Sequence, residues 1–176
     1  MKKIFIVVDM QKDFISGSLG STDAQGIVDK VAEKIEEERK NGSEIIFTLD
    51  THYENYPETL EGKKLPVSHC VENTDGWKLD EKLQPLVKDE KELVIKPTFG
   101  SVHLAEDILK NKVDSDTEIE LCGLCTDICV VSNALLLRAF FPNTRISVNS
   151  ELCRGTSMEN HNAALTTMKC CHIDVI

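Results

Sequence analysis

Apolar and polar residues alternate along this chain in two patterns. Short apolar runs, with the length of buried strands, are separated by longer segments in which apolar residues recur at helical spacing. The short runs predict strands at residues 4–8, 44–49, 92–95, 117–122, 145–148 and 172–176. The longer segments predict helices at residues 27–40, 102–109, 127–140 and 156–170.

Strands that alternate with helices favour one fold class. They predict a parallel sheet with helices on both faces and right-handed crossovers, which is a three-layer α/β/α sandwich. The length of 176 residues fits one domain, residues 1–176, and no linker or internal repeat divides it. Residues 50–90 form a long connection with little periodicity, and a connection of that length in a compact domain is usually functional.

Composition and charge narrow the choice of partners. The chain is 41% hydrophobic, which argues against disorder, and its net charge of -10 disfavours nucleic acid and anionic membrane surfaces. No apolar stretch approaches the ~18 residues that a membrane helix needs. The seven cysteines are an odd number, and several lie in apolar patterns, as buried free thiols do. We therefore expect a cytoplasmic protein that acts on a small molecule.

Three reactive side chains follow the predicted strands. Asp9 comes after the first strand, Lys96 after the third, and Cys129 one turn into the helix after the fourth. Because parallel strands end at one edge of a sheet, an acid, a base and a thiol can meet there as a nucleophile with its activating neighbours. A helix N-terminus favours the thiolate, so we expect a lowered pKa for Cys129. Lys96 would stabilise that thiolate, and Asp9 would accept its proton.

A second group of polar side chains follows the second strand. Asp50-Thr-His52 places two metal-ligating residues close together, and His69 lies seventeen residues further on. Asp and His suit zinc, manganese or iron. Glu58 and Glu61 lie between the two histidines as candidate supplementary ligands.

The order and spacing of these motifs resemble the isochorismatase-like cysteine hydrolases, and within them the nicotinamidases. The resemblance runs from residue 4 to about residue 164. The matching segments are Val7-Val-Asp-Met-Gln-Lys-Asp-Phe14, Asp50-Thr-His52, Pro66-Val-Ser-His-Cys70, Lys96-Pro-Thr-Phe-Gly-Ser101 and Gly123-Leu-Cys-Thr-Asp-Ile-Cys129. The resemblance implies a six-stranded sheet in the order 3-2-1-4-5-6 and a homo-oligomer.

The same resemblance implies a reaction and its residues. A carboxamide, nicotinamide first, would be hydrolysed through a thioester on Cys129 to the acid and ammonia, with Asp9 and Lys96 completing the catalytic triad. One divalent ion, zinc first, would be held by Asp50, His52 and His69, with Glu58 as the further candidate. A cis peptide between Leu124 and Cys125 would aim the backbone N–H groups of Cys125 and Cys129 at the oxyanion. Four side chains would support or line the substrate pocket: Gln11, Phe14, Trp77 and Phe99.

The sequence departs from the family's motifs at two points, and three alternative interpretations of its function remain. No aromatic residue occurs at positions 65–68, just before His69, and no third histidine lies between His52 and His69. Another small amide or ureido compound is therefore the alternative substrate. The alternative from another class is a non-catalytic thiol or metal-binding protein, in which Cys129 is a structural thiol. Cys122-Gly-Leu-Cys125 has the spacing of a redox dithiol, but a redox motif normally opens a helix after the first strand.

Overall fold

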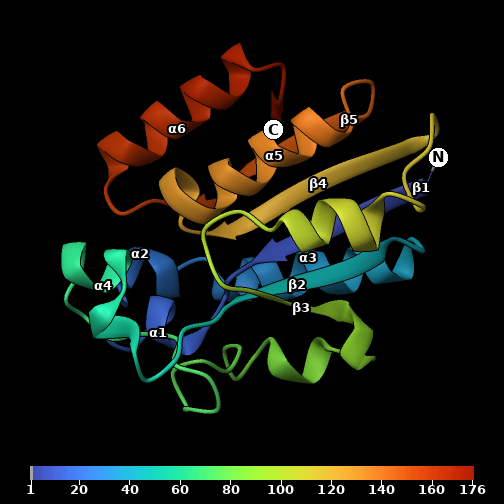
Figure 1. The fold of residues 1–176 in the computed structure, drawn as a ribbon. Helices are drawn as coiled ribbons and strands as arrows, with labels where there is room; N and C mark the ends of the chain where they lie inside the picture. The colour runs from blue at the N-terminus through green and yellow to red at the C-terminus, as the bar shows by residue number, and fades with distance from the viewer. Residues whose placement is uncertain (1) are drawn as a thin grey trace.

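The computed structural model describes residues 2–176, and its centre is a sheet of six parallel strands (Figure 1). The strands lie in the order β3-β2-β1-β4-β5-β6, which confirms the predicted order. Their bounds are β1 Lys2–Val8, β2 Glu44–Asp50, β3 Leu93–Lys96, β4 Thr117–Leu124, β5 Arg145–Arg154 and β6 Asp174–Val175. The five residues from Ile4 to Val8 are fully buried, as expected of a central parallel strand that is covered on both faces.

Two strands differ most in length from the prediction, while the bounds of the other four differ by one or two residues. The last strand was predicted over residues 172–176 but pairs only at Asp174–Val175. The fifth strand was predicted to end at residue 148 but continues to Arg154, through a register shift opposite β4. The polar residues 149–151 interrupt its apolar pattern, whereas Leu152 and Cys153 are buried again. The extra length carries the strand's carboxyl end to the same edge as those of its neighbours.

Helices cover the two faces of the sheet. The long ones are α3 Val28–Lys40, α5 Val131–Phe140 and α6 Met158–Cys170, with π-helical segments η4 Leu104–Leu109 and η5 Thr126–Val130. Helix α5 contacts η4 and α6 on one face, whereas α3 lies against β2 on the other (Figure 1). This division follows from right-handed crossovers that lead outward from β1 in two directions. No helix within residues 2–176 is long and apolar enough to cross a membrane.

Short elements gather at the carboxyl ends of the central strands (Figure 1). They are α1 Lys12–Ile15, α2 Thr22–Gln25, η1 Tyr56–Glu58 and α4 Leu60–Lys64. The last two belong to the long connection after β2, where the elements are too short to produce a periodic pattern. The same connection ends in η2 Gln84–Leu86 and η3 Glu90–Glu92, which lead into the start of β3 and are hydrogen-bonded to Arg39 at the end of α3. Short elements therefore surround the carboxyl edge of the sheet on several sides.

A buried carboxylate ties α3 to the sheet. The Glu38 side chain is 3% exposed and lies 2.6 Å from Lys3 Nζ, 2.9 Å from Lys34 Nζ and 2.6 Å from the donating Ser43 hydroxyl. Burial by itself would raise the pKa of Glu38, but hydrogen bonds from Lys3, Ser43 and Lys34 outweigh it and lower the pKa to about 2. A lowered pKa means that the ionised group stabilises the folded state above its unfolded pKa.

Replacing this carboxylate tests that stabilisation. Glu38→Gln is expected to lower the unfolding free energy near neutral pH by about 2–3 kcal/mol. The difference from wild type should shrink as the pH falls from about 4.5 to about 2, because Glu38 is protonated over that range. Urea unfolding at several pH values measures both effects. The control is Glu37→Gln, whose side chain is 60% exposed. Equal losses for both variants, or a loss independent of pH, would contradict the prediction.

Candidate active site

Asp9, Lys96 and Cys129 come together although they belong to three separate elements. Lys96 Nζ lies 2.7 Å from Asp9 Oδ2 and 3.4 Å from Cys129 Sγ. Asp9 directly follows β1, Lys96 ends β3, and Cys129 lies in η5 behind β4. Asp9 and Lys96 are fully buried, and Cys129 is 3% exposed. The strand ends thus bring the predicted acid, base and thiol into contact.

The chain holds Asp9 in one orientation. Its backbone is left-handed, with φ 48°, and its N–H donates to the Thr48 carbonyl oxygen at 3.2 Å. The Thr48 hydroxyl donates to Asp9 Oδ1 at 2.6 Å, which leaves Oδ2 for Lys96. Gly123 on the neighbouring strand has φ 119°, and a Cβ there would lie 2.1 Å from the Val8 oxygen, so only glycine fits beside this turn.

The charges of this group depend on burial and on its neighbours. Burial alone would lower the pKa of Lys96, but Asp9, Cys129 and Asp50 reverse this and hold the pKa above its ordinary value. Lys96 is therefore an ammonium. Burial raises the pKa of Asp9, and the attraction of Lys96 offsets this only in part. The site thus contains a fixed cation beside a carboxyl group that accepts a proton readily.

The expected low pKa of Cys129 is wrong for the resting site. Burial raises the pKa of the Cys129 thiol well above its ordinary value, and Asp9 adds to this while Lys96 opposes it. A helix N-terminus stabilises a nearby anion by only about 0.3–1 kcal/mol. Full burial can shift the pKa of a side chain by several units, and one unit corresponds to ~1.4 kcal/mol. The effect of burial on the pKa of Cys129 therefore exceeds the effect of the helix dipole, and the resting side chain is a neutral thiol.

A cluster of metal-ligating side chains adjoins the triad. One ligand atom each from Asp50, His52 and His69 lies within 4.8 Å of the others. Asp50 Oδ2 is 3.1 Å from His52 Nε2, and Asp50 Oδ1 accepts from Lys96 Nζ at 3.1 Å. Burial would raise the pKa of Asp50, but the bond with His52 and the charge of Lys96 lower it overall. Asp50 thus joins the cluster to the triad.

The fourth side chain beside the cluster is Glu61, not Glu58. Glu61 Oε1 lies 3.6 Å from His52 Nε2 and 3.8 Å from His69 Nε2. Glu58 is exposed in η1 and lies outside the cluster, so its expected part in the metal site is not met. Both glutamates follow His52 in a connection without periodicity, so their spacing alone does not distinguish them. The first turn of α4 brings Glu61 to the histidines.

Hydrogen bonds behind the cluster orient its members. His69 Nδ1 lies 2.8 Å from the Val67 carbonyl oxygen, which can only accept. Nδ1 therefore carries the proton in the neutral ring, and Nε2 presents its lone pair to the cluster. The Gln11 amide donates to the Asp50 carbonyl at 2.9 Å and accepts from the Asp50 N–H at 2.8 Å. Gln11 thus positions Asp50 and does not line the substrate cavity.

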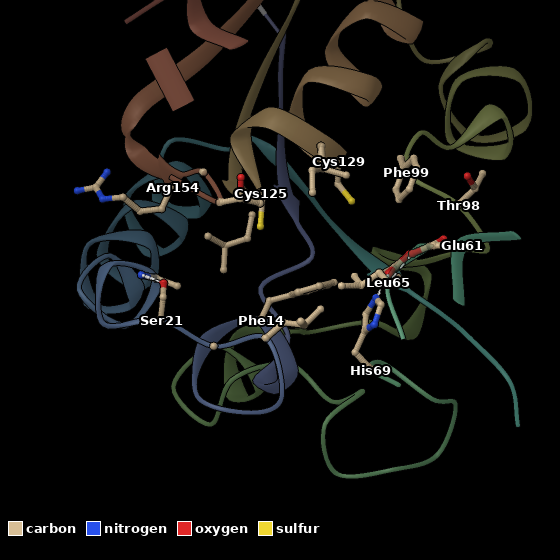
Figure 2. A pocket seen from close by; sticks show the side chains of 18 of the residues that line it. Phe14, Ser21, Glu61, Leu65, His69, Thr98, Phe99, Cys125, Cys129 and Arg154 are labelled. Carbon is tan, nitrogen blue, oxygen red and sulfur yellow. Dashed lines mark hydrogen bonds and ion pairs between the residues drawn. The ribbon is translucent and has the colours of Figure 1, made fainter. Parts of the chain in front are cut away.

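A cavity of about 750 Å³ opens beside the triad (Figure 2). Cys129, Asp50, Glu61 and His69 line one part of it. Two of the predicted pocket residues line it as well, namely Phe14 and Phe99. Trp77 does not, so the expectation that it forms a pocket wall is not met. Its indole N–H donates instead to the Thr51 hydroxyl at 2.8 Å.

The turn between β4 and η5 also has its predicted geometry. The peptide bond between Leu124 and Cys125 is cis. Within residues 2–176, no group accepts a hydrogen bond from the Cys125 N–H, while the Cys125 carbonyl accepts from Val130 N at 3.1 Å. Both Cys125 and Cys129 line the cavity. Arg154 and Thr98 line it too and were missed, Arg154 because the predicted fifth strand ended too early.

Fold and site together define a class: three-layer α/β hydrolases whose reactive cysteine sits at the carboxyl edge of the sheet, here beside a histidine and carboxylate cluster. Comparison with known proteins narrows this class to one family. The profile of the isochorismatase domain matches residues 3–176, and the chain belongs to the isochorismatase family of hydrolases.

Named relatives and solved structures agree with that placement. A nicotinamidase from Schizosaccharomyces pombe is 32% identical over 145 residues, which cover 74% of this chain and 60% of the relative. A pyrazinamidase from Pyrococcus horikoshii, solved in complex with zinc, is 26% identical with a TM-score of 0.80, covering 100% of this chain and 99% of its own. An N-carbamoylsarcosine amidase from Thermoplasma acidophilum is 26% identical with a TM-score of 0.81, covering 99% and 95%.

Proposed function

We propose that this protein is a nicotinamidase, a cysteine-dependent amidohydrolase that converts nicotinamide and water to nicotinate and ammonia. The observation that carries the proposal is the contact of Lys96 Nζ with Asp9 Oδ2 and Cys129 Sγ beside a cavity. A structural thiol needs no buried ammonium and carboxylate around it. The similarity to a nicotinamidase and a pyrazinamidase supports the substrate class.

The reaction follows from the states of the three side chains. The resting thiol gives its proton to Asp9 as its sulfur attacks the amide carbonyl, and the Lys96 ammonium stabilises the developing thiolate. Asp9 then protonates the leaving amine, the C–N bond breaks, and a thioester remains on Cys129. Water hydrolyses this thioester with Asp9 again as base. Backbone N–H groups of Cys125 and Cys129 are the donors available to the oxyanion in both steps.

The cluster beside the triad suits a divalent ion. Asp50, His52, His69 and Glu61 would hold it, and two imidazole nitrogens with two carboxylates fit zinc, with manganese or iron as alternatives. The zinc complex of the similar pyrazinamidase supports zinc. When bound, such an ion supplies a Lewis acid to which a substrate heteroatom, such as a pyridine nitrogen, can bind.

Replacing the fourth candidate ligand tests this site. Glu61→Gln is expected to weaken zinc binding about 10–100-fold, because a neutral amide is a poorer zinc ligand than a carboxylate. Glu58→Gln is the matched control, since Glu58 is exposed and outside the cluster. Competition with a chromophoric zinc chelator measures both affinities. Equal affinities in the two variants would remove Glu61 from the metal site.

Ammonia release from a panel of amides decides between substrates. Zinc-replete protein should release ammonia from nicotinamide and from pyrazinamide. Release from ureido acids but not from nicotinamide would favour the second candidate, to which the likeness to N-carbamoylsarcosine amidase points. No release from any compound in the panel would mean that the protein is not an amidohydrolase and would favour a non-catalytic thiol or metal-binding role.

A further inference from the structure

A loop without regular structure forms one wall of the cavity. It runs over residues 97–101, between the end of β3 and the turn that leads into η4. Thr98 and Phe99 form this Phe99 wall, and Figure 2 shows both on the side of Cys129 away from Arg154. Phe99 is 41% exposed, so the packing of its own ring does not fix the wall. The position of the wall must therefore come from the backbone of the loop.

Asn133 holds the backbone of this loop. It belongs to α5, one helical turn after Cys129, and is 1% exposed. Its side-chain N–H groups donate to the carbonyl oxygens of Phe99 at 3.0 Å and of Cys129 at 2.8 Å. Its side-chain oxygen accepts from the Ser101 N–H at 2.9 Å. One side chain thus joins both ends of residues 99–101 to the segment that carries the nucleophile.

Further contacts of the loop leave it little freedom. A Cβ on Gly100 would lie 3.4 Å from the Ser132 carbonyl oxygen, so the loop backbone packs closely on α5. The Thr98 carbonyl oxygen accepts from Lys96 Nζ at 3.1 Å. The loop is therefore bonded to the ammonium of the triad at one end and to Asn133 at the other.

The burial of Asn133 argues that its amide serves this connection. The other buried residues of α5 are Ala134 and Leu137, which are apolar. A buried amide is costly unless its hydrogen bonds are made, and an apolar side chain would fill the same space without that cost. What the amide adds is two donors and an acceptor that fix the spacing between the loop and the segment that contains Cys129.

We propose that Asn133 is a positioning residue that sets the distance between the Phe99 wall and the Cys129 sulfur, and thereby the fit of the substrate ring. This inference rests on the amidohydrolase function proposed above. A ring whose carboxamide lies at Cys129 would pack against Phe99, since aromatic rings pair favourably. Asn133 does not line the cavity, so it acts on the substrate only through the loop.

Steady-state kinetics with nicotinamide tests this role. In Asn133→Ala, KM should rise about ten-fold while kcat stays within about two-fold of wild type, because the wall binds the ring equally in the substrate and in the transition state. A residue that served only stability would lower the folded fraction, and so the apparent kcat, without changing KM. Asn133→Asp keeps the volume but cannot donate to both carbonyl oxygens, so KM should rise there as well.

A double-mutant cycle shows whether Asn133 acts through Phe99. Phe99→Ala alone should raise KM about ten-fold and keep the fold, because this side chain is partly exposed. Asn133→Ala should then add little to KM in the Phe99→Ala background, since both changes remove the same contact. Additive effects, or an unchanged KM in Phe99→Ala, would overturn the proposal. Failure of both Asn133 variants to fold would assign the residue to stability and overturn it too.

Asn149→Ala is the matched control for a structural asparagine. Asn149 is half-buried in β5, its Nδ2 donates to Glu120 Oε1 at 3.3 Å, and it does not line the cavity. Its loss should lower the urea midpoint and leave KM unchanged. A raised KM in this variant would mean that KM merely follows stability, which contradicts a specific role for Asn133.

Two further outcomes separate this inference from the proposed function. If wild type hydrolyses nicotinamide and neither Asn133 variant changes KM, the positioning role is overturned and the amidohydrolase function stands. If wild type hydrolyses no amide, the function fails and the inference fails with it.

Discussion

Cys129→Ala is expected to lower kcat/KM for nicotinamide by at least about 10,000-fold, the scale seen when a catalytic nucleophile is removed. The sulfur forms the thioester in the proposed reaction, and although Cys125 also lines the cavity, it is the Cys129 sulfur that lies 3.4 Å from the Lys96 ammonium. Because Cys129 is buried and packed in η5, alanine also leaves a small void. The loss of stability should nevertheless stay within about 1–2 kcal/mol, as for removal of one small buried group.

The control for this variant is a cysteine away from the site. Cys171→Ala is suitable, because Cys171 is an exposed free thiol after α6. Its kcat/KM should match that of wild type. Mass spectrometry of protein quenched during turnover gives a second measurement, since a nicotinoyl adduct should be found on wild type and be absent from Cys129→Ala. Residual activity within ten-fold of wild type in Cys129→Ala would exclude the thioester route.

The sequence predicted the triad because strand ends are easy to locate. Apolar runs end directly before Asp9 and at Lys96, and parallel strands bring their ends to one edge of the sheet. Neither step needs knowledge of side-chain packing. The strand order and the cis peptide were implied by the resemblance and not by periodicity. The structure contains both.

What the sequence could not provide depended on contacts between distant segments. The choice of Glu61 over Glu58 depends on how η1 and α4 fold back over His52. The position of Trp77 depends on its bond with Thr51, which lies 26 residues earlier in the chain. The pKa of Cys129 depends on burial by neighbours from other elements, whereas a sequence displays only the local helix terminus. Arg154 was missed because polar residues within β5 concealed its end.

The raised pKa values of Cys129 and Asp9 fit a mechanism in which the proton moves only during attack. A preformed thiolate would need no base, and Asp9 would then act mainly as a counter-ion for Lys96. With both groups shifted upward by burial, a thiol beside a carboxyl group that readily accepts a proton is the consistent resting state. A mechanism with a resting thiol and one with a preformed thiolate differ in the role that they predict for Asp9.

Asp9→Asn is expected to lower kcat/KM by about 1,000- to 10,000-fold, because the amide cannot accept the thiol proton or return it to the leaving amine. Stability should respond differently. A pKa raised by folding means that ionised Asp9 costs stability once the pH exceeds that raised pKa, and a neutral asparagine removes this cost. The side-chain oxygen of the new asparagine can still accept from the Thr48 hydroxyl, as the Asp9 carboxylate does. We therefore expect an unfolding free energy within about 1 kcal/mol of wild type, or higher.

Kinetics and urea unfolding on the same preparations test this separation of activity from stability. The control is Asp75→Asn, whose side chain is 70% exposed and pairs with Lys12 at the surface; both quantities should stay at the wild-type values. If Asp9→Asn instead loses several kcal/mol of stability, its carboxylate serves chiefly to neutralise the buried Lys96. If it keeps most of its activity, the proton of Cys129 goes elsewhere. Since Lys96 is already an ammonium and cannot accept it, the nearest remaining carboxylate is Asp50, 3.1 Å from Lys96 Nζ.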